Sequence, residues 1–401
     1  MGTLLKFEIK KIVMKKSTIV TFVILFAIQL FLAISGSLGS TYVEDVFLET
    51  HAERNRIDRE HGLALSGRAI DDALFEEMQT AYESFDWNNP DYRWTEEYNQ
   101  GVRRYKDLED KLKAWGYGSG YSFDNMTEEV FYDFREQNRD SMWEAYALSD
   151  KEKTYWLEKD AEVGVPFTYK YAQAYDSLIS MQGMYMTCML MTFFIAISMV
   201  TVFAEEHTRK TDQLILCARY GKGKAYFAKI LAGSLVVFVV NVVFTGMLLI
   251  GKFYSYGVEG FDAVVQAVCV PWYAYPLTMG QALLIMAGLL FLAGVMAAIF
   301  AMLLAEILHN SIGAMAVVVG LLFAARLVPI PASFRVLSQV WNYMPINMLK
   351  LDTGFTDPRL VNLFGIQLTG WQFAPILYVV LTGLMVFIGA KVYRTYQVSG
   401  R

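Results

Sequence analysis

Long apolar stretches separated by polar segments dominate the chain, and each stretch is about as long as a helix that crosses a bilayer. Such a helix needs about 20 residues at ~1.5 Å per residue to cross a hydrocarbon core ~30 Å thick. The apolar stretches are Ser17–Leu38, Leu178–Ala204, Phe227–Ile250, Ala282–Leu304, Ile312–Val328 and Phe373–Ala390. This pattern predicts an all-α, polytopic membrane protein with six transmembrane helices.

The first sixteen residues have a different, amphipathic pattern. Their apolar residues recur at one-turn spacing, at Leu5, Ile9, Ile12 and Val13. Five lysines occupy positions between and after them: Lys6, Lys10, Lys11, Lys15 and Lys16. A basic helix of this kind suits a surface rich in anionic lipid. Residues 1–39 are therefore interpreted as an interfacial helix on the inner membrane surface, followed by the first span.

Residues 40–177 contain no apolar stretch of membrane length. They hold 31 Asp and Glu residues against 16 Lys and Arg, a net charge of -15 within a chain whose total is -5. Helical spacing recurs through them, with breaks at Asn88–Pro90, Gly116–Gly120 and Gly164–Pro166. The pattern predicts a large helical domain outside the membrane, and a fragment covering residues 42–165 is expected to be soluble and helical by itself.

The distribution of basic residues predicts the orientation. Lys and Arg number five in the N-terminal helix, five in Arg209–Lys224 and three in the C-terminal tail, but only one in residues 251–280. The positive-inside rule then places both termini in the cytoplasm and residues 40–177 outside the cell. Residues 178–401 form a five-span membrane domain in this interpretation. Glu306 and His309, one turn apart at an inner turn, fit either a proton relay or a simply hydrated pair.

The segment between the second and third spans is short, charged and partly amphipathic. It reads FAEEHTRKTDQLILCARYGKGKAYFAKIL from Phe203 to Leu231, so leucines lie inside a charged stretch. Those residues fit an interfacial turn lying on the headgroups. They also resemble the cytoplasmic coupling segment of the type 2 ABC exporter permeases.

In that family, Glu-x-x-x-x-Thr-x-x-Leu precedes a proline-containing turn, and the next span opens with a step like Lys-Ile-Leu. Glu206, Thr211 and Leu214 match those spacings, and Lys229–Leu231 matches the step. Lys210 replaces the family's glycine, and the usual proline is missing near Ala218. The resemblance implies that the coupling segment, residues 205–226, contacts an ATPase. The residues expected at that contact are Glu205, Glu206, Thr211, Leu214, Leu216 and Arg219.

The resemblance implies the permease subunit of a bacterial ABC exporter in the cell membrane. Such a subunit pairs with a second permease, identical or related, and with cytoplasmic ABC ATPase subunits. An amphipathic peptide, such as a peptide antibiotic, or another hydrophobic compound is the expected substrate. The alternative is a membrane sensor or scaffold that does not transport and whose outer domain binds a ligand.

The sequence contains no motif for nucleotide hydrolysis or metal chemistry that could drive transport. Gly221–Lys224 is similar to a phosphate loop but lacks the G-x-x-x-x-G-K-[ST] spacing. Four histidines and three cysteines show no spacing typical of a metal site. We therefore expect no enzymatic activity, no catalytic or metal-binding residues, no bound cofactor and no nucleic-acid partner, with ATP bound by the partner subunit.

Overall fold

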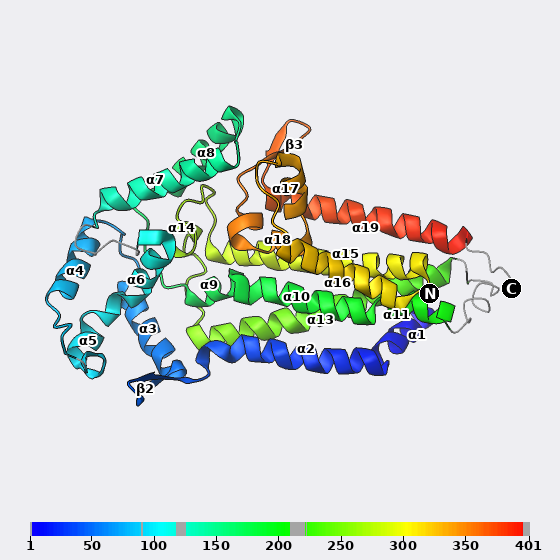
Figure 1. Cartoon of the computed structure of the whole chain (residues 1–401), viewed down its shortest axis with the longest axis horizontal. Helices are drawn as coiled ribbons and strands as arrows, with labels where there is room; N and C mark the ends of the chain where they lie inside the picture. Colours follow the sequence, from blue (N-terminus) through cyan, green and yellow to red (C-terminus); the bar gives the residue numbers. More distant parts are fainter. Residues whose placement is uncertain (1, 90, 118–125, 209–220, 222, 396–401) are drawn as a thin grey trace. The chain divides into compact units, whose positions relative to one another are not determined.

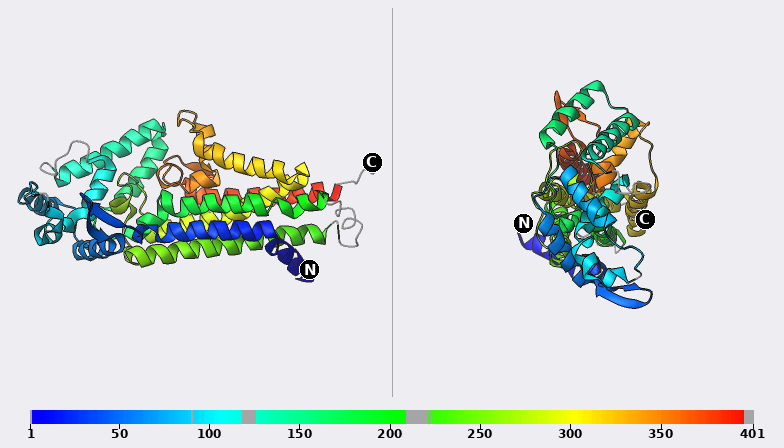
Figure 2. Two further views of the ribbon diagram at one scale, coloured as in Figure 1. Left: turned by 60° about the horizontal axis from the view of Figure 1, so that its bottom comes forward. Right: turned by 90° about the vertical axis from the view of Figure 1, so that its left-hand side faces the viewer.

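The computed structural model describes residues 2–89, 91–117, 126–208, 221 and 223–395. The chain is mostly helical (Figures 1 and 2). Its contacts divide it into two compact units. The first, called here the span unit, comprises Met1–Phe31, Met181–Leu248 and Met286–Arg401. The second, called the insert unit, comprises Leu32–Ser180 and Leu249–Ile285.

Five helical segments are long and apolar enough to cross a membrane: Lys16–Ser37, Met181–Thr208, Lys224–Tyr256, Met279–Leu308 and Gly370–Thr395. The corresponding helices are α2 (Lys16–Ile34), α10 (Met186–Ser198) with α11 (Thr201–Thr208), α13 (Lys224–Tyr256), α15 (Met279–Leu308) and α19 (Gly370–Thr395). They are preceded by α1 (Gly2–Val13), which confirms a helix at the basic N-terminus. Five of the six predicted spans thus have the expected length.

The remaining predicted span is α16 (Ser311–Leu327), an apolar helix of 17 residues. At ~1.5 Å per residue it is about 25 Å long, slightly less than a hydrocarbon core. Asn310 caps its start, because its Oδ1 accepts a hydrogen bond from the backbone N–H of Ile312 at 2.9 Å. Whether α16 crosses the bilayer stays a prediction.

Buried polar side chains connect the apolar helices of the span unit. Gln29 of α2 donates its amide to Thr187 Oγ1 of α10 at 3.0 Å and to the Phe244 carbonyl of α13 at 3.3 Å. Asn241 of α13 donates to the Leu290 carbonyl of α15 at 3.1 Å. In hydrocarbon such groups need a partner on another helix, and each bond favours one pairing of neighbours.

A short, irregular region joins α16 to α19. It contains α17 (Arg335–Asn342), α18 (Pro345–Met348), the helical turn η7 (Leu351–Phe355), and an antiparallel hairpin of β3 (Val361–Leu363) and β4 (Ile366–Leu368). Val361 pairs with Leu368 and Leu363 with Ile366.

The insert unit opens on a second antiparallel hairpin, β1 (Ser40–Val43) with β2 (Val46–Thr50). Its helices of seven or more residues are α3 (His51–Leu65), α4 (Asp72–Glu83), α6 (Lys106–Leu112), α7 (Glu128–Ala145), α8 (Asp150–Val163) and α9 (Gln173–Ile179). Shorter elements are η1 (Ser35–Ser37), η2 (Tyr92–Trp94), α5 (Glu96–Gln100), η3 (Arg103–Tyr105), η4 (Lys113–Tyr117), η6 (Met181–Tyr185, in the span unit) and α14 (Val265–Val268). The chain is mostly helical, as predicted, with one small hairpin in each unit.

Polar residues start several of these helices. Thr50, Asp71 and Thr127 accept a backbone N–H from the first turn of α3, α4 and α7, respectively. Ser149 and Glu152 form a capping box at the start of α8. These caps give the helices of the acidic insert defined starts.

The core of the insert unit includes residues from far along the chain. Leu74, Phe75 and Phe131 are buried together with Phe167 and Tyr169, and Ala267 joins the same cluster. Val264 and Trp272 pack against it. Trp115 Nε1 also donates to the Cys269 carbonyl at 3.1 Å. Residues 264–272 therefore complete this core.

That core changes the expectation for an isolated fragment. Residues 42–165 end before Phe167 and Tyr169, and residues 42–180 still lack Val264, Ala267 and Trp272. We expect residues 42–180 joined by a Gly/Ser linker to residues 257–279 to be more stable than residues 42–180 alone by at least about 2 kcal/mol, because core side chains lose their packing in the latter. Thermal melts followed by circular dichroism, with size-exclusion chromatography, measure the difference. Equal melting curves would show that residues 257–279 do not belong to this core.

Candidate functional site

The ends of the coupling segment are held by four charged side chains, which we call the charge cluster: Glu8, Glu206 and Lys229, which are buried, and Lys11, which is partly exposed. Lys229 of α13 is fully buried, and its Nζ lies 3.3 Å from both carboxylate oxygens of Glu8 of α1. The same ammonium is hydrogen-bonded to Glu206 Oε1 of α11. Lys11 Nζ reaches that oxygen from α1 at 2.5 Å. Two carboxylates and two ammonium groups thus meet where three helices converge.

The balance of charge explains how these groups tolerate burial. Burial lowers the pKa of Lys11, but the hydrogen bond and the charge of Glu206 outweigh it and leave that pKa raised. Lys229 Nζ also lies 5.7 Å from the ring centroid of Phe203. A second ion pair, Lys15 Nζ to Glu205 Oε2 at 2.7 Å, is more exposed. Each acidic residue of the pair at 205 and 206 is therefore connected to a lysine near the N-terminus.

A polar contact beside the charge cluster joins α11 to the end of α15. His207 Nε2 lies 3.0 Å from Glu306 Oε2, and the His207 and His309 rings are 4.2 Å apart between centroids. Glu306 is almost fully buried. The alternative of a simply hydrated pair therefore does not hold for Glu306, whereas His309 is exposed. Proton transfer by Glu306 and His309 stays a prediction.

The structure brings together only part of the predicted coupling site. Glu205 and Glu206 face lysines of this same chain, as described above. Thr211, Leu214, Leu216 and Arg219 lie outside the described residues. Glu8, Lys11 and Lys229 were not predicted to cluster with Glu206. A useful signal was present, since a lysine inside an apolar helix requires a counter-charge.

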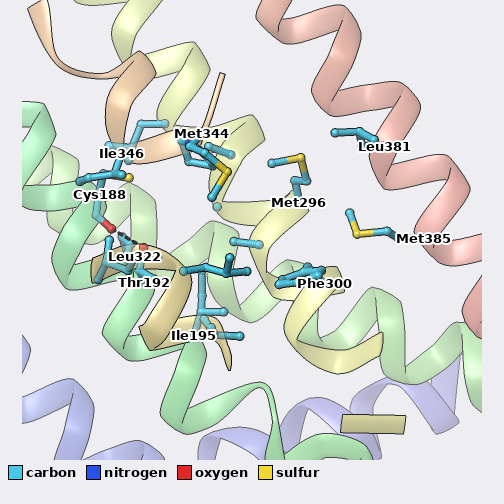
Figure 3. A pocket seen from close by; sticks show the side chains of 18 residues that line it. Cys188, Thr192, Ile195, Met296, Phe300, Leu322, Met344, Ile346, Leu381 and Met385 are labelled. Carbon is cyan, nitrogen blue, oxygen red and sulfur yellow. Dashed lines mark hydrogen bonds between the residues drawn. The ribbon is translucent and has the colours of Figure 1, made fainter. Parts of the chain in front are cut away.

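The second candidate site is an apolar cavity of about 330 Å³ within the span unit (Figure 3). Its wall comes from α10, α15, α16, α18 and α19. Four methionines line it: Met191, Met296, Met344 and Met385. Unbranched thioether chains adapt to ligands of different shape. The volume is near the lower end of the ~300–1,000 Å³ typical of small-molecule pockets.

The hydroxyl and thiol groups in this wall are occupied or buried in helix packing. Thr192 donates its hydroxyl to the Cys188 carbonyl at 2.9 Å, within its own helix. No Asp, Glu, Lys, Arg or His is among the described residues that line the cavity. A charged or strongly hydrogen-bonding ligand would lose its hydration there without compensation. The cavity therefore suits an apolar group.

Comparison with known proteins gives one family. Residues 15–346 match the family described as ABC-2 family transporter protein. No curated protein and no solved structure matches the chain. The matched residues include the charge cluster's Glu206 and Lys229 and most of the cavity wall. Since the match covers most of the chain and several helices have membrane length, this protein is a multi-pass membrane protein that belongs to the ABC-2 transporter family.

Proposed function

We propose that this chain is the permease subunit of an ABC exporter, and that it moves an amphipathic peptide or another hydrophobic substrate outward with ATP hydrolysed by a partner. ABC-2 permeases in general work with an ABC ATPase. Both termini and residues 205–226 face the cytoplasm in this proposal, and residues 40–177 lie outside. A second permease subunit completes the transporter.

The charge cluster is the observation that supports this proposal most directly. Residues 209–223 connect α11 to α13, and in the sequence Glu206 and Lys229 lie close to the two ends of that connection. Both side chains are also bonded to α1. A force applied to the connection by an ATPase would therefore reach three helices together. Ion pairs with two or more partners resist separation more than a single surface pair does.

The apolar cavity supports the substrate class. Its wall offers contact to an aliphatic chain or an apolar side chain and offers no counter-charge. A cavity of about 330 Å³ holds one such group rather than a whole peptide. We propose that it receives the apolar part of a substrate whose polar part stays in water. Peptide antibiotics belong to this class of compound, as do hydrophobic drugs and lipid-linked molecules.

A sensor or scaffold is the second candidate function. The acidic insert unit, with its own core, would serve as a ligand-binding domain in that case. The family assignment favours the transporter, because the family that matches residues 15–346 is described as a transporter family. Binding of an ABC ATPase separates the two functions.

The test is recovery of the cognate ATPase with full-length permease carrying Leu214→Asp. A central apolar anchor in an interface is worth about 2 kcal/mol or more, so affinity should fall about 30-fold. Glu206→Ala is a poor choice for this purpose, because Glu206 belongs to the buried charge cluster.

Leu214→Met is the matched control, since it keeps an apolar side chain of similar volume. Permease in the membrane is quantified beside the recovered ATPase. We expect normal recovery with the control and reduced recovery with Leu214→Asp at equal membrane levels. Normal recovery with both variants would contradict the role of Leu214, and failure of any ATPase to bind wild-type chain would favour the sensor.

A further inference from the structure

Helix α17 has its polar and apolar faces reversed relative to a helix of a water-soluble domain. Val336 is 75% exposed and Val340 is 60% exposed, and Leu337 between them is also exposed. Ser338, a polar residue, is only 3% exposed. A helix in water would normally turn these faces the other way. The exposed face of α17 is therefore expected to lie against a non-aqueous neighbour.

A buried ion pair fixes this reversed orientation. Arg359 is almost fully buried, and its Nη2 lies 2.6 Å from Asp357 Oδ2, with Nε 2.9 Å from Oδ1. The same guanidinium donates to Ser338 Oγ at 2.5 Å and to the Arg335 carbonyl at 3.0 Å. Rotating α17 to bury its valines would break these bonds inside a low-dielectric site. The apolar face thus has to remain outside.

A second, independent feature lies on the hairpin β3–β4. Phe364 at its tip is 97% exposed, and Ile366 beside it is also exposed. Phe364 has φ 53°, a left-handed conformation that glycine or asparagine normally occupies in such turns. Residues 361–368 read VNLFGIQL and contain no charge. A large aromatic ring is therefore presented at a position where a hairpin in water usually carries a small polar residue.

Both features stand at the ends of apolar helices. Trp341 Nε1 of α17 donates to the Val328 carbonyl, just after α16, at 3.0 Å. Tyr378 of α19 donates its hydroxyl to the Tyr343 carbonyl, just after α17, at 3.0 Å. Strand β4 ends two residues before α19 begins. Figure 1 shows α17 and β3 beside the start of α19.

The apolar surface continues from these features onto the helices themselves. Leu327 and Val328 are exposed at the end of α16, and Val379 and Val380 are exposed on α19. In a multi-pass membrane protein, such helix surfaces face lipid. Continuity with them favours lipid over a protein partner as the neighbour of α17 and of the hairpin tip. Amphipathic helices that lie in a bilayer have this same arrangement, with the apolar face toward the acyl chains.

We propose that the apolar face of α17 and the tip of hairpin β3–β4 form an anchor in the bilayer interface, with phospholipid as its partner. The anchor lies at the membrane surface where α16 ends and α19 begins. It holds the connection between these two helices at headgroup depth, whichever side of the membrane that surface faces. The proposal does not depend on the transport function.

The test measures the depth of single labelled positions in full-length protein. Cys188, Cys217 and Cys269 are replaced by alanine, and an environment-sensitive fluorophore is attached to Val340→Cys or Phe364→Cys. The protein is reconstituted in phosphatidylcholine vesicles that contain a lipid with a nitroxide near the headgroup or deep in the chain. The proposal places both labels about 5–10 Å below the headgroups. We therefore expect emission that is blue-shifted relative to the label in water, and quenching that is much stronger with the shallow nitroxide than with the deep one. Asp110→Cys, at an exposed position of α6 in the insert unit, is the aqueous control.

Two outcomes would overturn the anchor. Emission and quenching like those of the Asp110 control would place both positions in water. Disulfide cross-links between two copies at Val340→Cys, without quenching by either lipid, would assign the face to a second copy of the chain. Should labelling of Val340→Cys prevent reconstitution, Val336→Cys on the same face provides the same measurement.

Discussion

Replacing Lys229 by methionine is expected to destabilise the protein by about 3–5 kcal/mol, the usual result of breaking a buried ion pair on one side. Methionine retains most of the side-chain volume, so the loss of stability comes from the missing charge rather than from a cavity. Glu8 and Glu206 would remain buried with one fewer ammonium group between them. The midpoint of thermal unfolding in detergent, measured on purified full-length chain, reports the change.

A matched pair of controls isolates the effect of the buried charge. Lys15→Met removes the partner of Glu205 in a more exposed ion pair, and such pairs contribute about 0–1 kcal/mol. Adding Glu8→Gln to Lys229→Met removes one of the two buried carboxylates that have lost the Lys229 ammonium. The double variant should therefore recover part of the lost stability. If Lys229→Met and Lys15→Met have equal effects, the charge cluster does not hold α1, α11 and α13 together.

The spans were predictable because their signal is local. An apolar stretch of membrane length identifies a helix without reference to any other part of the chain, and this holds for α2, α10, α13, α15 and α19. Helices α4 and α7 of the insert unit also follow local apolar spacing. Helix α3 has little such spacing, since two of its three buried residues are Asn55 and Gly62. Its position depends on tertiary contacts that no short window contains.

The candidate site was predictable only in part for the same reason. Glu206 and the Lys229 step are visible in the sequence around the coupling segment, but Glu8, the partner of Lys229, is 221 residues away from that lysine. Nothing in local spacing pairs a glutamate of the N-terminal helix with a lysine of α13. The methionines of the apolar cavity likewise come from different helices. Sequence patterns predicted the elements, while the contacts between elements required the structure.

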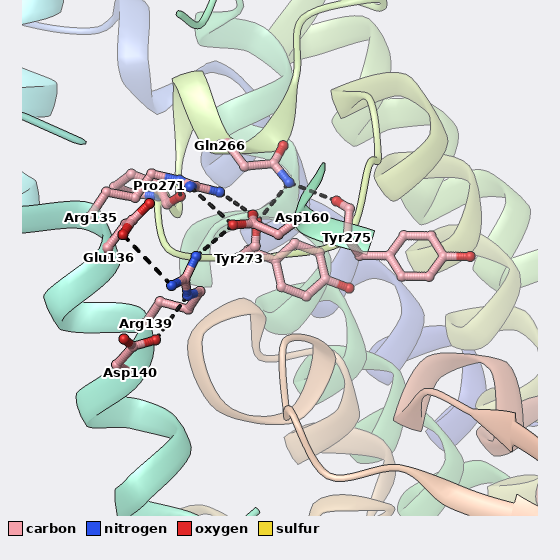
Figure 4. A network of polar contacts seen from close by, with 9 residues as sticks. All are labelled: Arg135, Glu136, Arg139, Asp140, Asp160, Gln266, Pro271, Tyr273 and Tyr275. Atoms are coloured by element: carbon pink, nitrogen blue, oxygen red, sulfur yellow. Dashed lines mark hydrogen bonds and ion pairs between the residues drawn. The ribbon is translucent and has the colours of Figure 1, made fainter. Parts of the chain in front are cut away.

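The insert unit shows how distant segments meet at one acidic residue. Asp160 of α8 receives hydrogen bonds from two arginines of α7, with Arg139 Nη1 at 2.7 Å and Arg135 Nη1 at 3.2 Å from Oδ2 (Figure 4). Arg135 also donates through Nε to the Pro271 carbonyl at 2.8 Å. Gln266, near Pro271, donates to the Tyr273 carbonyl at 2.8 Å. Helices α7 and α8 are thereby connected to the segment that completes the core.

Asp160→Leu should therefore cost about 3–5 kcal/mol, because Arg135 and Arg139 are both buried and would lose their shared carboxylate. Asp140→Leu is the control, since Asp140 also binds Arg139, at 3.0 Å, but from an exposed position where an ion pair contributes about 0–1 kcal/mol.

Hydrogen exchange of the full-length protein should show faster exchange in α7 and α8 for Asp160→Leu, whereas spans such as α15 keep their protection. Exchange in the spans is expected to stay unchanged, because the contacts of Asp160 lie within the insert unit. Unchanged exchange in α7 and α8 would contradict a stabilising role for Asp160. Faster exchange throughout the spans would show instead that the insert and span units unfold as one.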